Sequence, residues 1–169
     1  QEGVYIAKIE QRGKPTADIL KPLIEEILKN FPWPKSMRWG AGEQAWVRPL
    51  HSILCIFDGK VVPVEFAGIK AGNTTRGHRF LAPKPIEIKN AGEYEGALKK
   101  AFVIADREAR KAEILKQANE VVASCKLQVA SDPGLLEEVV GLVEWPVVLV
   151  GTIDKNYMDL PREVLVSEM

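Results

Sequence analysis

Apolar residues recur at helical spacing in residues 16–30, where Ile and Leu return every three or four positions. Thr16 has a side chain that can cap this predicted helix. Pro22 would interrupt the interior of a long helix, so a start nearer Lys21, with Pro22 in the first turn, is the alternative. The stretch is therefore predicted as a helix that begins either after Thr16 or near Lys21.

The same period dominates the second half of the chain. It predicts helices in residues 91–103, 106–124 and 132–145, and a final helix from about residue 160. Asp106 and Asp132 stand where N-caps belong, and Pro133 suits a first helical turn.

The clearest strand signal is the pair of runs LHSILCIF (50–57) and KVVPVEF (60–66), separated by Asp-Gly. Such a dipeptide between apolar runs predicts a hairpin with a tight turn. Both faces of the first run carry apolar residues, which predicts burial on two sides. Pro63 puts the second strand at a sheet edge or beside a bulge.

Two further strands are predicted at the ends of the chain. Val4, Ile6 and Ile9 alternate weakly in residues 4–10, and residues 146–153 form a continuous apolar run typical of a strand buried on both faces. Helices and strands mix without βαβ alternation, so the fold class is α+β, a mixed or antiparallel sheet packed with helices.

Length and composition fit one soluble α+β domain over residues 1–169, with a β-rich sub-lobe 1–90 and a helix-rich sub-lobe 91–169 as an internal division. The missing initial Met and the helical pattern at the end predict a piece cut from a larger protein.

Net charge is zero, so global charge favours neither nucleic acid nor membrane. Neither a membrane span nor a signal peptide is predicted, and Cys55 and Cys125 read as free thiols, which predicts a cytoplasmic location.

No motif predicts catalysis or a metal site. His51 and His78 lack Cys or His partners at ligand spacing, and there is no nucleophile elbow or phosphate-loop fingerprint. We therefore expect neither a catalytic residue, a metal nor a cofactor in this chain.

Charge is distributed unevenly. Residues 66–86 hold Lys70, Arg76, Arg79 and Lys84 and no acid, whereas residues 132–169 hold eight carboxylates and two cations. The segment GIKAGNTTRGHRF (68–80) also supplies hydroxyls, an amide and glycines, the groups that bind phosphate. The prediction is an anion- or RNA-binding loop. A solvated turn, or internal pairing of Arg76 or Arg79 with the acidic half, stays open.

Several long strings, PKSMRWG, RPLHSILCIFDGKVVPVEFAGIKAGNTTRGHRF, VIADREARKAEI and LLEEVVGLVEWPVVLVGTID, resemble the β subunit of bacterial heterotetrameric (α₂β₂) glycyl-tRNA synthetase. The resemblance runs in order from about Phe31 to Met169. It implies part of a glycine–tRNA ligase that uses ATP and Mg²⁺ in a separate α subunit. The implied partners are that α subunit and glycine tRNA, and the implied fold is similar to the editing-type domain of the phenylalanyl-tRNA synthetase β subunit.

The resemblance and the chemistry together give a set of RNA-binding candidates: Lys35, Arg38, Arg48, Lys70, Arg76, His78 and Arg79. Their role would be to neutralise tRNA phosphates, with recognition of shape and backbone. Trp39 and Trp145 are predicted to pack in the core. Two alternatives stay open: a purely structural scaffold, and an editing-type hydrolase with a pocket lined by Thr74, Thr75, His51 or His78.

Overall fold

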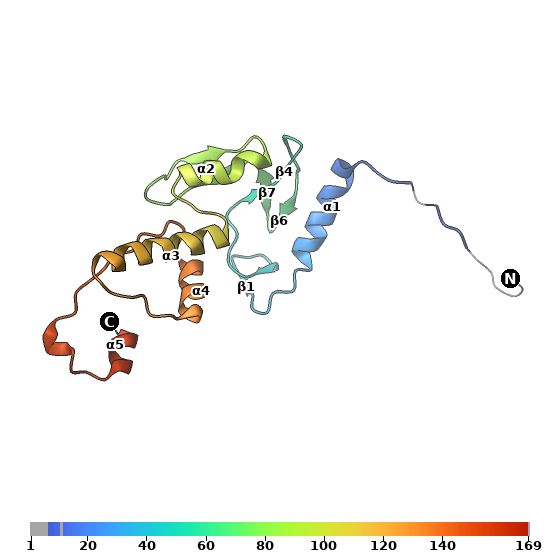
Figure 1. Cartoon of the computed structure of the whole chain (residues 1–169). Helices are drawn as coiled ribbons and strands as arrows, with labels where there is room; N and C mark the ends of the chain where they lie inside the picture. The colour runs from blue at the N-terminus through green and yellow to red at the C-terminus, as the bar shows by residue number, and fades with distance from the viewer. Residues whose placement is uncertain (1–6, 11, 169) are drawn as a thin grey trace, which may run out of the picture. The chain divides into compact units, whose positions relative to one another are not determined.

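The computed structural model describes residues 7–10 and 12–168, and the chain divides after Ala97 into two compact units (Figure 1). Short strands and one long helix make up the first unit, and helices make up the second. The fold class is α+β, as the sequence predicts. In the part of the chain that is described, no helix has the length and apolar character needed to cross a membrane.

The helix α1 spans Thr16–Lys29, so the predicted helix is confirmed but its start is corrected. Pro15 is the N-cap and offers no side-chain hydrogen bond, and Thr16 is the first helical residue. Pro22 lies inside the helix, so the alternative start near Lys21 is wrong. A carboxylate holds the helix to the strands, because Glu25 Oε1 accepts a hydrogen bond of 2.8 Å from the backbone nitrogen of Glu65.

The strands of the first unit are short and form several small sheets. β1 (Met37–Arg38) pairs antiparallel with β2 (Ala45–Trp46), β4 (Ile56–Phe57) with β5 (Lys60–Val61), and β8 (Thr74–Arg76) with β9 (Pro85–Glu87). A three-stranded sheet has the order β3 (Ile53–Leu54), β7 (Ile69–Gly72), β6 (Glu65–Phe66), with β3 and β7 parallel and β6 and β7 antiparallel. The sheets are thus both mixed and antiparallel.

The predicted Asp-Gly hairpin is confirmed. Asp58 and Gly59 both have positive φ, 49° and 70°, the requirement of the type I′ turn, and Phe57 faces Lys60 across it. The predicted strands are too long, however. The first run is broken at Cys55, and Leu50–Ser52 lie outside any strand. The second run is broken at Pro63, around which Val64 donates to the carbonyl of Val62 at 2.7 Å in a three-residue turn.

Residues 68–80, predicted as a loop, are mostly strand. Ala67 and Gly68 have φ of 53° and 77° and turn the chain from β6 into β7, with Phe66 opposite Ile69. Residues 69–72 and 74–76 then form β7 and β8. The polar residues and glycines of this segment predict a loop. Pairing of β7 with β6, which contains Glu65, and of β8 with β9, which contains Glu87, instead makes it part of the sheets.

The predicted helices of the second half are confirmed, with shorter bounds for several. They are α2 (Tyr94–Lys100), preceded by the 3₁₀ turn η1 (Ala91–Glu93), α3 (Arg107–Ser124), α4 (Pro133–Leu142) and α5 (Arg162–Glu168). A 3₁₀ turn that was not predicted, η2 (Lys155–Tyr157), precedes α5. Asp106 accepts from the nitrogen of Ala109 and Asp132 from that of Leu135, so both predicted caps are present. The division between the units falls inside α2.

The strand predicted at 146–153 is wrong. These residues form no strand, and Val147 and Leu149 are 67% and 86% exposed. The Gln117 side chain holds the segment to α3 by donating to the carbonyl of Pro146 and accepting from the nitrogen of Val148. At the other end, Val4 and Ile6 lie outside the described residues, and Ala7–Glu10 form no strand.

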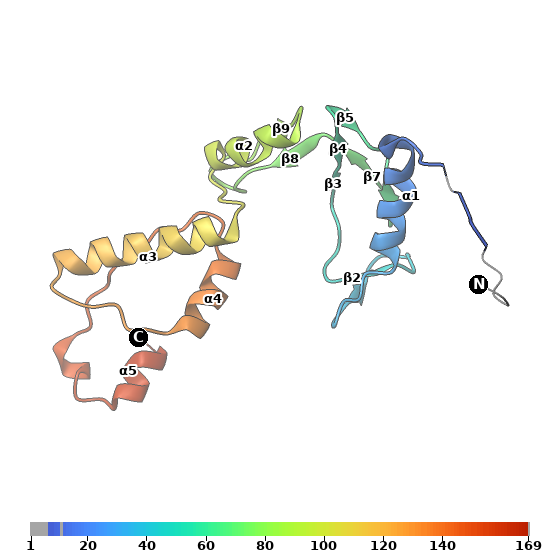
Figure 2. The ribbon, with the colours of Figure 1, turned by 45° about the vertical axis from the view of Figure 1, so that its right-hand side comes forward.

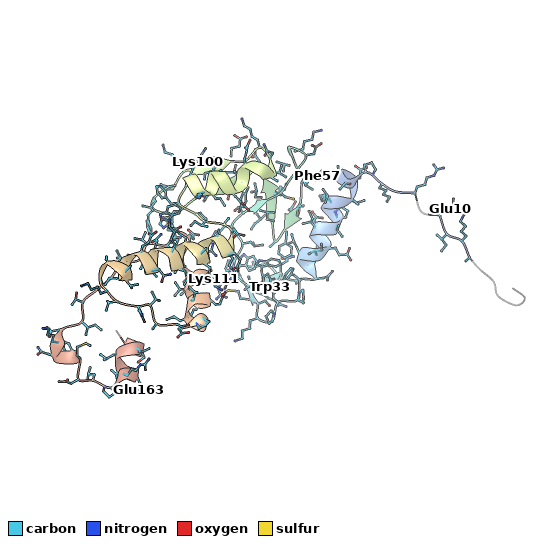
Figure 3. The ribbon with its side chains drawn as sticks, in the orientation of Figure 1. Glu10, Trp33, Phe57, Lys100, Lys111 and Glu163 are labelled. Atoms are coloured by element: carbon cyan, nitrogen blue, oxygen red, sulfur yellow. The ribbon has the colours of Figure 1, made fainter. Side chains whose placement is uncertain are left out.

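Each unit has a small apolar core. The buried apolar residues are Val62, Val64, Phe66 and Ile88 in the first unit, and Leu98, Ala101, Ile114, Val140 and Pro146 in the second. Next to Phe66 the rings of Phe31, Trp33 and Trp46 pack with centroids 4.5–5.6 Å apart (Trp33 is labelled in Figure 3). Trp39 and Trp145, predicted to pack in the core, are only half-buried and lie outside the buried core, although Trp145 packs edge-on against Phe102.

Ionic contacts join α3 to α4 in the second unit. Glu137 on α4 pairs with Arg107 and Lys111 on α3. Arg107 also donates to the Glu137 carbonyl, and Arg110 donates to those of Val140 and Ile104. Arg110, from the first turn of α3, thus satisfies a carbonyl in the last turn of α4, where a helix leaves acceptors free and favours cations.

Candidate nucleic-acid interface

The β8–β9 hairpin carries three of the seven candidate residues (Figure 2). Thr74 faces Glu87, Thr75 faces Ile86 and Arg76 faces Pro85. The segment that connects β8 to β9 begins directly after Arg76 and ends before Pro85, so the pairing of these two residues fixes both of its ends. We call residues 76–84 the tip.

His78 builds the turn at this tip. Its Nδ1 accepts hydrogen bonds from the backbone nitrogens of Phe80 and Leu81, at 3.3 and 3.2 Å, and its carbonyl accepts one from Ala82 at 2.9 Å. An N-cap side chain satisfies the free nitrogens of a first helical turn in the same way. His78 therefore has a structural role in the turn, and the RNA contact predicted for its ring stays a prediction.

Capping the turn leaves its side chains pointing away from the core. Arg76, Arg79 and Lys84 are exposed, and Phe80 and Leu81 are 80% and 55% exposed. No Asp or Glu occurs between residues 76 and 84. The tip is thus a short basic surface with an aromatic ring among its cations.

Strand pairing brings carboxylates close to part of the acid-free basic stretch 66–86. Glu65, just before the acid-free stretch, lies on β6 opposite Lys70, and opposite charges on paired positions attract. Glu87, just after it, lies opposite Thr74 and accepts a hydrogen bond from Asn73 at 2.9 Å. Lys70 therefore lies opposite a carboxylate across the sheet, whereas Arg76, Arg79 and Lys84 belong to a segment without Asp or Glu.

Comparison with known proteins gives the family. A family model described as the glycyl-tRNA synthetase beta subunit matches residues 1–169. The chain belongs to this family.

Curated relatives carry the same name as the family model. The chain is 49% identical to the glycine–tRNA ligase beta subunit of Ruegeria sp. (strain TM1040) over 170 residues, which is 98% of this chain and 25% of that protein. It is 45% identical to the beta subunit of Paracoccus denitrificans and 44% identical to that of Phenylobacterium zucineum, again over 170 residues and 25% of each relative. The chain therefore spans about a quarter of the length of these relatives.

In this member of the beta-subunit family, the four other candidates lie outside the tip, with Lys70 on β7 and three near β1 and β2. Arg38 is on β1, Lys35 precedes it and Arg48 follows β2, so all three belong to a separate hairpin. All are exposed, and Arg48 donates to the carbonyl of Val47 at 2.8 Å. The structure brings Arg76, His78 and Arg79 together, but not the full set of seven.

The sequence candidates omitted Phe80 and Lys84. A signal for both was present in HRFLAPK, where apolar residues stand between cations in an otherwise polar stretch. Their significance depends on the cap at His78 and on the exposure of the ring, and neither can be deduced from residue types alone.

The scaffold alternative predicts internal pairing of Arg76 and Arg79, and the editing alternative predicts a pocket lined by Thr74, Thr75, His51 or His78. Arg76 and Arg79 are exposed, and within the described part of the first unit neither forms an ion pair. Their pairing with the carboxylates of residues 132–169 stays a prediction. Of the editing candidates, His51 and Thr74 are exposed, Thr75 is half-buried on β8, and the Nδ1 of His78 is used by the turn.

A groove of about 520 Å³ lies in the second unit, between α3, α4 and residues 129–133. Its lining is mainly aliphatic, including Leu115, Leu135 and Val139. Its two charged groups have structural partners, because Lys111 pairs with Glu137 and Asp132 caps α4. The groove does not bring together an acid and a base that are free to react.

Proposed function

We propose that this chain is part of a glycine–tRNA ligase and that it binds and positions glycine tRNA through the tip of the β8–β9 hairpin. Membership of the beta-subunit family supports the enzyme. The observation that carries the tRNA contact is the tip itself, where Arg76, Arg79 and Lys84 are exposed without a carboxylate between them.

The mechanism is electrostatic and positional. Arginine and lysine at the tip neutralise phosphates and release counterions, so binding weakens steeply with salt. The cap at His78 fixes the turn before RNA arrives, which limits the entropy lost on binding. Recognition is then of backbone and shape, and Lys35, Arg38 and Arg48 on the second hairpin add charge for a longer stretch of RNA.

The remaining parts of the reaction lie elsewhere in this proposal. Glycine activation, with its ATP and Mg²⁺, belongs to a separate α subunit, which is the protein partner of the β subunit, and the enzyme is cytoplasmic. In this proposal the chain is similar in fold to the editing-type domain of the phenylalanyl-tRNA synthetase β subunit. It serves for binding rather than hydrolysis, because glycine has no smaller amino acid with which to be confused.

The test is a titration of labelled glycine tRNA at several salt concentrations. Arg76→Ala/Arg79→Ala should weaken binding and reduce the slope of log affinity against log salt by roughly 1.4–1.8, for two lost phosphate contacts. The charge-matched control is Lys60→Ala/Lys89→Ala, which removes two exposed cations of the same unit outside the tip.

Equal affinities and slopes for the tip variant and the wild type would show that the tip is not the contact and would favour the scaffold role. Equal losses in the tip and control variants would show that only the total charge matters. Release of amino acid from mischarged tRNA would favour the editing alternative.

A further inference from the structure

Phe80 is far more exposed than the fold requires. Its exposed fraction is 80%, against 45% for Phe31, 42% for Phe57 and 4% for Phe66 in the same unit. The residue also sits in a defined turn, since its own nitrogen is bonded to His78. Burial of the ring therefore gives no reason for an aromatic residue here.

The surroundings of the ring indicate the chemistry of its ligand. Arg79 is its neighbour in the chain, Arg76 and Lys84 lie at the ends of the same tip, and no carboxylate interrupts them. Proteins that hold single-stranded nucleic acid combine cations along the backbone with aromatic side chains on which bases stack. Bases in an A-form duplex are already stacked, so an exposed ring can reach only an unpaired base.

We propose that Phe80 stacks on an unpaired base of the bound tRNA while the cations of the tip hold the flanking phosphates. This inference rests on the proposed function and makes it more specific, because it restricts the RNA contacted here to a loop or a single-stranded end. Backbone contacts alone would not distinguish such a region from a duplex.

A protein partner is the competing occupant of the tip, and the charge argues against it. The cores of protein interfaces are depleted in charged residues, Lys above all, and are built around larger apolar areas. The large apolar side chains exposed at the tip are Phe80 and Leu81, and the same segment carries three cations. That pattern suits a polyanion with flat bases better than an apolar protein surface.

The test compares Phe80→Leu, which keeps an apolar side chain but removes the ring, with Phe80→Tyr, which keeps the ring. The probes are glycine tRNA, a single-stranded RNA and a duplex of the same sequence and length. Phe80→Leu should weaken tRNA binding by about ten-fold with an unchanged salt slope, since stacking involves no counterions. It should also lose the preference for single strand over duplex. Phe80→Tyr should bind as the wild type does.

The outcomes separate this inference from the proposed function. Wild-type RNA binding by Phe80→Leu, together with weakened binding by Arg76→Ala/Arg79→Ala, would overturn stacking and leave the tRNA-binding tip standing. Wild-type binding by both variants would overturn the tip as an RNA site. Normal RNA binding by Phe80→Leu with lost capture of the α subunit would assign the ring to a protein contact, and would likewise overturn stacking. Circular dichroism spectra of all variants check that they are folded.

Discussion

The Nδ1 atom of His78 lies 3.3 Å from the backbone nitrogen of Phe80 and accepts its hydrogen bond. The histidine thus fixes the backbone at Phe80, which has the most exposed aromatic side chain among the described residues of the first unit. A residue that chemistry alone assigns to RNA binding acts here through the backbone of its neighbours.

His78→Ala should loosen the tip and His78→Asn should preserve it. Asparagine carries its oxygen on Cγ, as histidine carries Nδ1, and both serve as acceptors for a first turn. Loss of a cap costs about 1 kcal/mol, so the amides of Phe80 and Leu81 should exchange with solvent several-fold faster in His78→Ala. Amide exchange measured by NMR checks this, and RNA affinity should fall in the same variant. Equal exchange in the two variants would refute the cap.

Arg110→Met should destabilise the second unit. Arg110 is half-buried and donates from Nε to the carbonyl of Val140, and from Nη1 to that of Ile104. Methionine preserves much of the apolar stem but leaves both acceptors unpaired, at a cost of about 1–3 kcal/mol. Urea unfolding followed by circular dichroism measures it.

The control for that variant is Lys116→Met on the same helix, where the side chain is 64% exposed. It should change the free energy of unfolding by no more than about 0.5 kcal/mol. Equal effects of the two substitutions would contradict the structural role of Arg110.

The contact between α3 and α4 should weaken in acid. Lys111, and next Arg107, hold the pKa of Glu137 below its usual value of about 4.5. A carboxylate whose pKa is lowered by folding stabilises the fold above its usual pKa, and that stability is lost as the pH falls through the lowered pKa. Stability should therefore be steady near neutrality and decline below about pH 4.5.

Glu137→Gln should remove part of this decline, whereas Glu138→Gln, at the exposed neighbouring position, should leave it in place. Unfolding measured between neutral and acid pH for both variants provides the comparison. An identical pH dependence in wild type and Glu137→Gln would show that the ion pairs contribute nothing.

Gly59→Ala should destabilise the β4–β5 hairpin. Gly59 has φ of 70°, where an L side chain is strained, and the substitution should cost about 1 kcal/mol. Gly96→Ala is the matched control, because Gly96 lies in α2 with nothing within 4 Å of the added Cβ. That change should stabilise by about 0.5–1 kcal/mol. Thermal unfolding of both variants should show shifts of opposite sign.

Local signals in the sequence predicted the parts of the fold that local chemistry decides. Asp106 and Asp132 cap helices as predicted, and Asp58-Gly59 forms the predicted turn. The strand predicted at 146–153 failed, because an apolar run becomes a strand only where another strand pairs with it. Here Gln117 takes the place of that partner at Pro146 and Val148.

The candidate site was only partly predictable for a similar reason. Counting charges along the chain identified Arg76 and Arg79, but it could not show that β6 returns Glu65 to a position opposite Lys70. Nor could it show that His78 turns its ring nitrogen to the backbone and leaves Phe80 exposed. Cross-strand register and side-chain direction depend on the tertiary structure. They restrict the candidate site from the basic segment 68–80 to the tip.

Photocrosslinking to glycine tRNA tests the central claim, that the tip binds RNA, most directly. A photoreactive benzoylphenylalanine replaces Leu81, which leaves Arg76, Arg79 and Phe80 in place, or replaces Phe57 at the β4–β5 turn (labelled in Figure 3) as a control. We expect a strong crosslink from position 81 that salt and Arg79→Ala suppress, and a weak one from position 57. Equal yields from the two positions, or a crosslink from position 57 alone, would contradict it.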